Sequence, residues 1–198
     1  MTGTEAQWIE QALQGDDNAF GFLVESYQKP VYSLCYRMLG NSNDAEDAAQ
    51  ESFIRAYQHL KKYDQDRSFT TWLLSIASHY CIDQIRKRRL PVVPMDELPV
   101  EIISDNRSPQ PENHLRQREK DALIQKMMNG LKPTVRAAIV LRYWYEFSEV
   151  EISETLKISV SAVKSRLFRA RRSLADAWIT NSSKSAIKER KPNESPAF

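Results

Sequence analysis

The chain has 198 residues, with 28 lysines and arginines against 26 aspartates and glutamates, so its formal net charge is only +2. This length allows one medium domain or two small ones, and this charge excludes a polycation. The first residues show no basic start followed by an apolar run, and no stretch approaches the roughly 20 apolar residues of a membrane span. Two cysteines, Cys35 and Cys81, are too few for a disulfide framework or a four-ligand zinc site. We therefore expect a soluble protein in the reducing cytoplasm, with both thiols in its core.

Apolar residues recur at helical spacing through most of the chain, and only five glycines interrupt them. This pattern predicts an all-α fold with helices at 5–14, 17–39, 43–60, 70–89, 113–130, 134–146, 148–156 and 160–178. Residues 90–111 contain five of the nine prolines and a net charge of −3, which is typical of an extended linker. We therefore predict two small helical domains, 1–89 and 113–180, joined by a linker at 90–112 and followed by a disordered tail at 181–198.

The helix expected at 43–60 carries carboxylates on one face. Asn43 and Glu46 have the spacing of a capping box. Asp44, Asp47 and Glu51 share a face at steps of three and four. This face is either ordinary solvated surface or a docking surface for a basic protein; no histidine lies at the spacing of a metal site. The opposite stripe is expected to be buried and consists of Ala45, Ala49, Phe53, Ala56 and Leu60.

The next segment, 61–89, mixes basic and aromatic residues. It contains Lys61, Lys62 and Arg67, and it ends in four consecutive cations at 86–89. Positive charge beside aromatic rings is typical of proteins that bind single-stranded DNA. Trp72 and Tyr80 also fit the helix core, so the loop at 61–69 is the better candidate for DNA contact. The aromatic residues of this segment are Tyr63, Phe69, Trp72 and Tyr80.

Basic residues exceed acidic ones by 13 to 8 in residues 112–180. The stretch VSAVKSRLFRARRSL, residues 160–174, has five cations, no acid and one apolar stripe formed by Val160, Val163, Leu167, Ala170 and Leu174. The shorter helix FSEVEISETL, with Val150, Ile152 and Leu156 as core candidates, precedes it across the turn KIS. Helix, short turn and helix form a helix-turn-helix, whose second helix enters the major groove of DNA.

A solvated basic helix is the alternative interpretation of 160–174, but solvated faces usually mix both signs of charge. Within a DNA-binding helix, Lys164, Ser165 and Arg169 are the best candidates for base edges. Arg166, Arg171 and Arg172 are better suited to phosphates.

Three segments in this order resemble an extracytoplasmic function (ECF) sigma factor, a small two-domain bacterial initiation factor. DAEDAAQESFIRAY is similar to the helix that binds the clamp of core RNA polymerase. FTTWLLSIASHYCIDQIRKRR is similar to the segment that melts the promoter and reads the minus-ten element. The stretch from LKPTVRAAIV to FRARRSL is similar to the domain that reads the minus-thirty-five element. The resemblance covers about residues 10–178.

The resemblance implies a role for each candidate residue. Polymerase binding would use Asp44, Asp47, Gln50 and Glu51. Contact with minus-ten DNA would use Lys61, Lys62, Tyr63, Arg67, Phe69, Trp72, His79, Arg86 and Arg88. Contact with minus-thirty-five DNA would use Ser161, Lys164, Ser165, Arg166, Arg169, Arg171 and Arg172. The linker would thread the cationic channels of polymerase.

The same resemblance implies no enzymatic activity, cofactor, metal or small-molecule substrate. It implies that core polymerase, promoter DNA and an anti-sigma factor, often membrane-bound, are the partners. The chain also departs from the family pattern. An asparagine is usual at His79, a threonine at Ala162, and glycines near Glu146 and at Lys157. A lysine in a turn that needs a left-handed residue would cost about 1 kcal/mol.

Two other functions fit part of the sequence. A conventional helix-turn-helix repressor or activator, with residues 1–110 for dimerisation or sensing, explains the basic helix but leaves 61–89 and the linker unexplained. A nuclease or metal-dependent hydrolase would need clustered catalytic residues, whereas His59, His79 and His114 are scattered along the chain. No glycine-rich phosphate-binding loop is found either.

Overall fold

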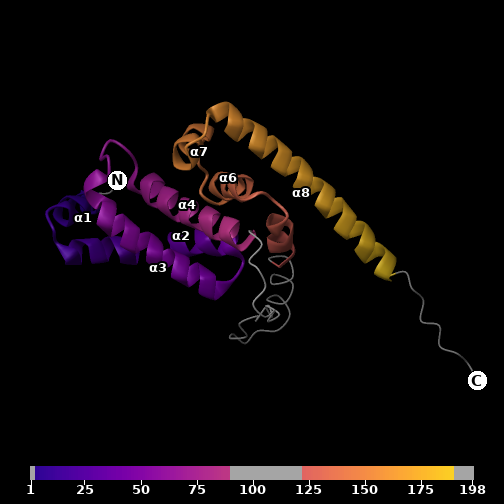
Figure 1. The fold of residues 1–198 in the computed structure, drawn as a ribbon, viewed down its shortest axis with the longest axis horizontal. Helices are drawn as coiled ribbons and strands as arrows, with labels where there is room; N and C mark the ends of the chain where they lie inside the picture. Colours follow the sequence, from indigo (N-terminus) through magenta and orange to yellow (C-terminus); the bar gives the residue numbers. More distant parts are fainter. Residues whose placement is uncertain (1–2, 90–121, 190–198) are drawn as a thin grey trace, which may run out of the picture.

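The chain is described by a computed structural model that covers residues 3–89 and 122–189. Within these ranges every regular element is a helix, which confirms the all-α prediction, and the helices form two adjoining groups (Figure 1). The predicted linker at 90–112 lies outside the described residues. No helix in the described ranges combines the length and the apolar character that crossing a membrane requires.

The first group contains α1 (Gly3–Leu13), α2 (Asp17–Leu39), α3 (Ser42–His59), the short helix η1 (Leu60–Lys62) and α4 (Phe69–Arg89). Helices α2, α3 and α4 pack on one another around a core that includes Leu34 and Leu73. Cys35 and Cys81 are fully buried in it, as the sequence predicts. A hydrogen bond with Cys35, together with burial, raises the pKa of Cys81, so this thiol stays protonated and unreactive.

The helix ends in this group follow ordinary capping chemistry. The Asp16 carboxylate accepts from the amide of Asn18 at 2.9 Å and begins α2, and Gly40, with φ 79°, ends it. Helix α3 begins after Asn41, whose side chain accepts from the Asp44 amide at 3.1 Å. The predicted capping box at Asn43 and Glu46 is therefore wrong, because Asn41 supplies the acceptor and the helix starts before Asn43.

The second group contains a helical segment at 122–129, then α6 (Pro133–Trp144), α7 (Glu149–Leu156) and α8 (Val160–Glu189). Helices α7 and α8 form the predicted helix-turn-helix, and Ser148 with Glu151 forms a complete capping box at the start of α7. Ile152, Val163 and Leu167 are buried between the helices, but the side chain of Val150 is 56% exposed, so its predicted core role is wrong. Val150 lies in the first turn of α7, on the side that faces solvent.

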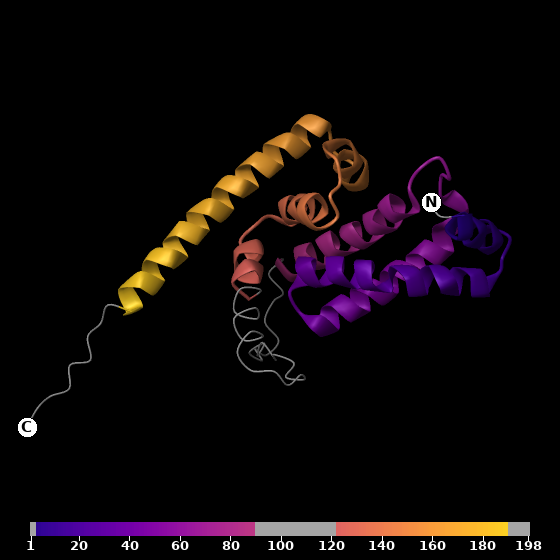
Figure 2. The same ribbon diagram turned by 180° about the vertical axis from the view of Figure 1, so that it is seen from behind.

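Helix α8 differs from the prediction at its C-terminal end. The sequence predicts an end at 178 and a disordered tail from 181, whereas α8 continues to Glu189 (Figure 2). Residues 179–189 contain no glycine or proline, and extending an existing helix is much easier than starting a new one. The rest of the predicted tail lies outside the described residues.

Two turns in the second group hold non-glycine residues in the left-handed region. Glu146 has φ 56° in the turn before α7, and Lys157 has φ 52° between α7 and α8. These are the positions where the family pattern usually has glycine. Each side chain therefore adds a steric cost of about 1 kcal/mol to the folded state.

Replacing Lys157 by glycine should stabilise the protein. Relief of the left-handed conformation outweighs the extra chain entropy of glycine in the unfolded state, so we expect the free energy of unfolding to rise by about 0.5–1 kcal/mol. Urea denaturation of the full chain measures it. Lys157→Ala is the matched control, because it keeps the Cβ atom and the strain. Equal stability of the two variants would contradict the argument.

Candidate polymerase and nucleic-acid interfaces

The first candidate surface is the acidic face of α3, which consists of Asp44, Asp47, Gln50 and Glu51. Helix α3 buries Ala45, Ala49 and Ala56 against its neighbours and turns Asp47 and Gln50 to solvent. The predicted buried stripe and the predicted exposed face are therefore both present. Asp44 and Glu51 are partly covered by arginines. The four residues therefore share one face of α3, but Asp44 and Glu51 are less exposed than Asp47 and Gln50.

The two arginines are Arg88 and Arg55. Arg88 connects the acidic face to α4, whereas Arg55 lies on α3 itself. Arg88, at the end of α4, binds Asp44 with both guanidinium nitrogens, at 2.6 and 2.8 Å. This bond raises the pKa of Arg88. Arg55 contacts Glu51 at 2.7 Å and lies 4.7 Å from the ring centre of Tyr80. Arg88 was predicted to contact DNA, but here its fork geometry is used to hold α3 against α4.

Ile54 extends the acidic face and was missed by the sequence analysis. Its side chain is 51% exposed, and it follows Gln50 and Glu51 by four and three residues on the same side of α3. Singly exposed aliphatic side chains are normal on protein surfaces, so Ile54 is notable only for its place beside the carboxylates of α3. The helical spacing was visible in the sequence, but the exposure was not.

The second candidate surface is the loop at 61–69 together with the start of α4. Lys61, Lys62 and Arg67 are exposed, as predicted. Tyr63 and Phe69 are not available to stack on DNA bases, because they are 6% and 1% exposed. They pack edge-to-face with ring centres 5.4 Å apart, and Trp72 contacts both. The predicted stacking roles of Tyr63 and Phe69 are therefore corrected. Both rings belong to a buried core that shapes the loop.

Hydrogen bonds make this loop rigid from within. Burial raises the pKa of Tyr63 to about 12, so its hydroxyl stays protonated and donates to the Arg67 carbonyl at 2.5 Å.

Further along α4, His79 is half-buried, with Nδ1 2.8 Å from the Ser75 carbonyl. Nδ1 is therefore the donor nitrogen, which leaves Nε2 as the ring atom that can contact a partner. Arg86 is exposed and pairs loosely with Asp83 at 3.5 Å.

The third candidate surface is the basic face of α8, which we define by Ser161, Lys164, Ser165, Arg169 and Arg172. Val163, Leu167 and Ala170 hold the helix on its domain, and all five residues of the basic face are exposed. Arg169 donates to the Ser165 carbonyl at 3.2 Å, and Lys164 lies 3.6 Å from Glu149 of α7. Both contacts are exposed, so they are weak and can be exchanged for DNA contacts.

Two predicted cations lie to either side of the basic face. Arg166 is half-buried and lines a hollow of about 400 Å³ with Lys132 and Arg169, so Lys132 is a cation at this site that sequence analysis missed. Arg171 borders an apolar hollow on the other side, with Tyr143 and Trp144. Arg166 and Lys132 therefore extend the basic face on one side, and Arg171 lies on the other side of the helix.

Phe168 is the third residue missed by the sequence analysis. Its ring is 62% exposed and lies among Lys164, Ser165 and Arg169. A single exposed apolar side chain is common on protein surfaces, so the position of this ring among the cations is the informative feature. An apolar side chain on a helix in the major groove can contact the methyl group of thymine. The signal in the sequence was its position one turn after Lys164 and Ser165.

No group of histidine, cysteine or carboxylate side chains with metal-binding geometry occurs in the described part of the chain. The three surfaces are an acidic helix face, a cationic loop with a buried aromatic core, and the basic helix of a helix-turn-helix.

Comparison with known families agrees with these features. The family described as Sigma-70 region 2 matches residues 23–90, and the one described as Sigma-70, region 4 matches residues 121–174. The ECF RNA polymerase sigma factor SigW of Bacillus subtilis is 40% identical over 174 residues, which cover 84% of this chain and 92% of that protein. SigE of Mycolicibacterium smegmatis, also an ECF sigma factor, is 32% identical, over 92% of this chain and 76% of its own.

Solved structures show the same fold. CnrH, in complex with the cytosolic domain of CnrY, matches with a TM-score of 0.67 and 25% identity, over 90% of this chain and 99% of that chain. The sigma factor RpoE of Bartonella quintana, in complex with the anti-sigma factor NepR, matches with a TM-score of 0.58 over 80% of this chain and 96% of its own, at 18% identity. The chain belongs to the ECF sigma factor family and is an RNA polymerase sigma factor that directs promoter-specific transcription.

Proposed function

We propose that this sigma factor binds core RNA polymerase through the acidic face of α3, with Ile54 as the apolar centre of the contact. Asp47 and Gln50 are exposed, and Ile54 follows on the same side of the helix. Carboxylates around an apolar residue provide charge steering and a buried contact in one surface. The residue-by-residue resemblance of α3 to the clamp-binding helix supports the same assignment.

The basic face of α8 is the reading surface for the minus-thirty-five element. The observation that carries this proposal is the exposed row of Lys164, Ser165, Phe168 and Arg169 on the second helix of a helix-turn-helix. Lysine and arginine match guanine acceptors, and phenylalanine matches a thymine methyl. Arg166 and Lys132 are placed to bind phosphates beside it, and Arg172 completes the cationic face.

The exposed cations of the loop at 61–69, together with half-buried Trp72 and His79 on α4, form the surface for minus-ten DNA. Its rigid aromatic core supports this role, because a preformed loop loses little entropy when it captures an unstacked base. We assign the domains as predicted, with 1–89 for polymerase and minus-ten binding, 113–180 for minus-thirty-five binding, and 90–112 as the linker between them.

An anti-sigma protein is the proposed regulatory partner. The solved relatives CnrH and RpoE are both described in complexes, the first with the cytosolic domain of CnrY and the second with the anti-sigma factor NepR. We propose the cytoplasm as the working compartment, with sequestration at the membrane where the anti-sigma protein is anchored there. No small molecule, cofactor or metal takes part in the proposed function.

Gel filtration with purified bacterial core polymerase tests the proposal first. We expect a stoichiometric complex that initiates at a selected promoter in a transcription assay. Tight binding to duplex DNA without polymerase, and no complex with polymerase from the native host, would instead indicate a stand-alone regulator.

Two variants should separate the binding surfaces. Arg169→Ala is expected to weaken recognition of the minus-thirty-five duplex by about 1–3 kcal/mol and to leave polymerase binding unchanged. The double change Asp47→Arg and Glu51→Arg should do the reverse, because like charges then face a basic clamp and cost several kcal/mol. Titrations of labelled protein against polymerase and against DNA measure both. The assignment fails if the two variants affect polymerase binding equally.

Phe168 should read a thymine methyl group. Phe168→Ala is expected to lower affinity for the preferred promoter by about 1 kcal/mol, and replacing the contacted thymine by uracil should have no further effect in that variant. Trp178→Ala is the matched control, because Trp178 is another exposed aromatic further along α8, at 54% against 62% for Phe168. Equal losses on thymine and uracil promoters would show that Phe168 does not contact the methyl group.

A further inference from the structure

A carboxylate lies beside the basic face of α8. The Oε2 atom of Glu149, in the first turn of α7, is 3.6 Å from Nζ of Lys164. The two side chains are 39% and 64% exposed, so a partner that approaches α8 can reach both of them. A negative charge at a surface for DNA repels phosphates, and its place there therefore requires another explanation.

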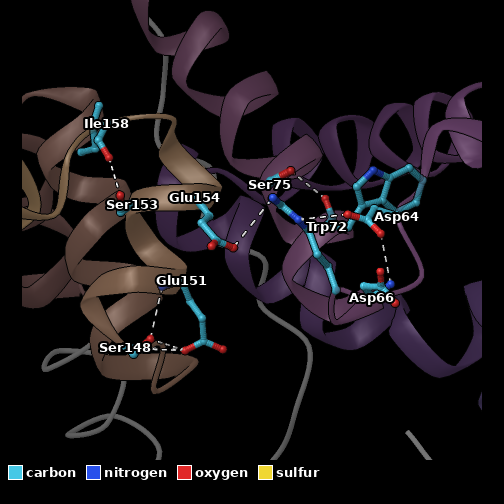
Figure 3. A network of polar contacts seen from close by, with 10 residues as sticks. Asp64, Asp66, Trp72, Ser75, Ser148, Glu151, Ser153, Glu154 and Ile158 are labelled. Carbon is cyan, nitrogen blue, oxygen red and sulfur yellow. Dashed lines mark hydrogen bonds and ion pairs between the residues drawn. The ribbon is translucent and has the colours of Figure 1, made fainter.

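Hydrogen bonds fix the helix ends that carry this ion pair. At the start of α7 the Ser148 amide donates to the Glu151 carboxylate at 2.8 Å, and the Glu151 amide donates to the Ser148 hydroxyl at 3.2 Å (Figure 3). The hydroxyl of Ser153 donates to the Ile158 carbonyl at 2.5 Å and thus holds the turn between α7 and α8. The backbone positions of the two charged residues are therefore set by the fold.

The neighbours of Lys164 place the pair near base edges. Lys164 lines one hollow on α8 together with Ser165, Phe168 and Arg169. The early residues of the second helix in a helix-turn-helix are the ones that approach bases in the major groove. Its contact with Lys164 puts the Glu149 carboxylate at the rim of this hollow.

The ion pair matches the major-groove edge of a G·C pair. Guanine offers its O6 atom as an acceptor, and cytosine offers its N4 amino group as a donor. These two atoms are hydrogen-bonded to each other within the base pair and are therefore about 2.9 Å apart. The 3.6 Å between the ammonium and the carboxylate is close to this spacing. An A·T pair has the donor and the acceptor in the opposite order, so both charges would face the wrong group.

We propose that Glu149 is a specificity-determining residue that reads one G·C pair of the minus-thirty-five element together with Lys164. The ammonium donates to guanine O6, and the carboxylate accepts from N4 of the paired cytosine on the other strand. The ion pair is exposed and weak in the free chain, so little is lost when it is exchanged for these contacts. The inference rests on the proposed reading of DNA by Lys164.

Selection from promoter duplexes randomised over the minus-thirty-five element tests the proposal, with the full chain bound to core polymerase. Lys164→Ala identifies the position at which the preference for G·C depends on this lysine. Glu149→Ala is expected to lower the preference for G·C over A·T at the same position by about five- to tenfold. Glu146→Ala is the matched control, because it removes an exposed carboxylate three residues earlier, and it should keep the preference of the parent.

A change in the DNA tests the contact itself. Replacing the cytosine of that pair by pyrimidin-2-one removes the N4 amino group and keeps guanine O6. We expect the affinity of the parent to fall about fivefold more than that of Glu149→Ala, because the variant has already lost the acceptor. Measuring both proteins on both duplexes cancels the effect of the analogue on the duplex. Equal losses for the two proteins would overturn the proposal.

The other outcomes separate this inference from the function on which it rests. A carboxylate also stabilises the N-terminal end of a helix, and Glu149 could serve α7 alone. In that case Glu149→Ala would change the affinity for all duplexes alike and leave the preference intact, which overturns the inference while the role of Lys164 stands. If no position depends on Lys164, the proposed reading by this residue fails and the inference fails with it.

Discussion

The unsatisfied carbonyls at the C-terminal end of α2 are the constraint on which the arrangement of this molecule depends. A helix end that is buried needs donors from elsewhere, and Arg136 and Gln125 supply them from the second domain. Arg136 is buried together with its charge. Separating the domains therefore exposes this charge to water, and docking them buries it again. The packing of α7 against α4 is part of the same contact between the two groups of helices.

On each of the three surfaces, a cation forms an ion pair with a carboxylate of the same chain. Arg88 is paired with Asp44, Arg67 with Glu154, and Lys164 with Glu149. Each of these cations thus has a carboxylate of the same chain as a partner, and Arg67 also lies 3.4 Å from Asp64 in its own loop. The pairs of Arg67 and Lys164 are long and exposed, so a phosphate can replace the carboxylate at little cost. The pair of Arg88 is bidentate and short, and it connects α3 to α4.

Aromatic residues in the loop at 61–69 have a different role from the one their composition indicated. Rings beside cations are typical of base stacking, but Tyr63 and Phe69 pack on Trp72 and leave only the cations at the surface. The two rings form a buried core inside the loop, together with Trp72. Phe168 shows the opposite case, since a ring that interrupts a basic helix is left exposed among the residues that would read the promoter.

The sequence by itself determined the helices, their apolar stripes, the basic and acidic faces, and the family. These features depend on residues three or four apart, and a periodic pattern records such local geometry directly. Tertiary structure alone decided that Arg88 is paired with Asp44, that Tyr63 and Phe69 are buried, that Val150 is exposed, and that Arg136 caps α2. Each of these depends on contacts between segments distant along the chain, such as Arg136 with Met38, 98 residues apart. No local period carries that information, because burial and pairing are decided by which surfaces the folded chain brings together.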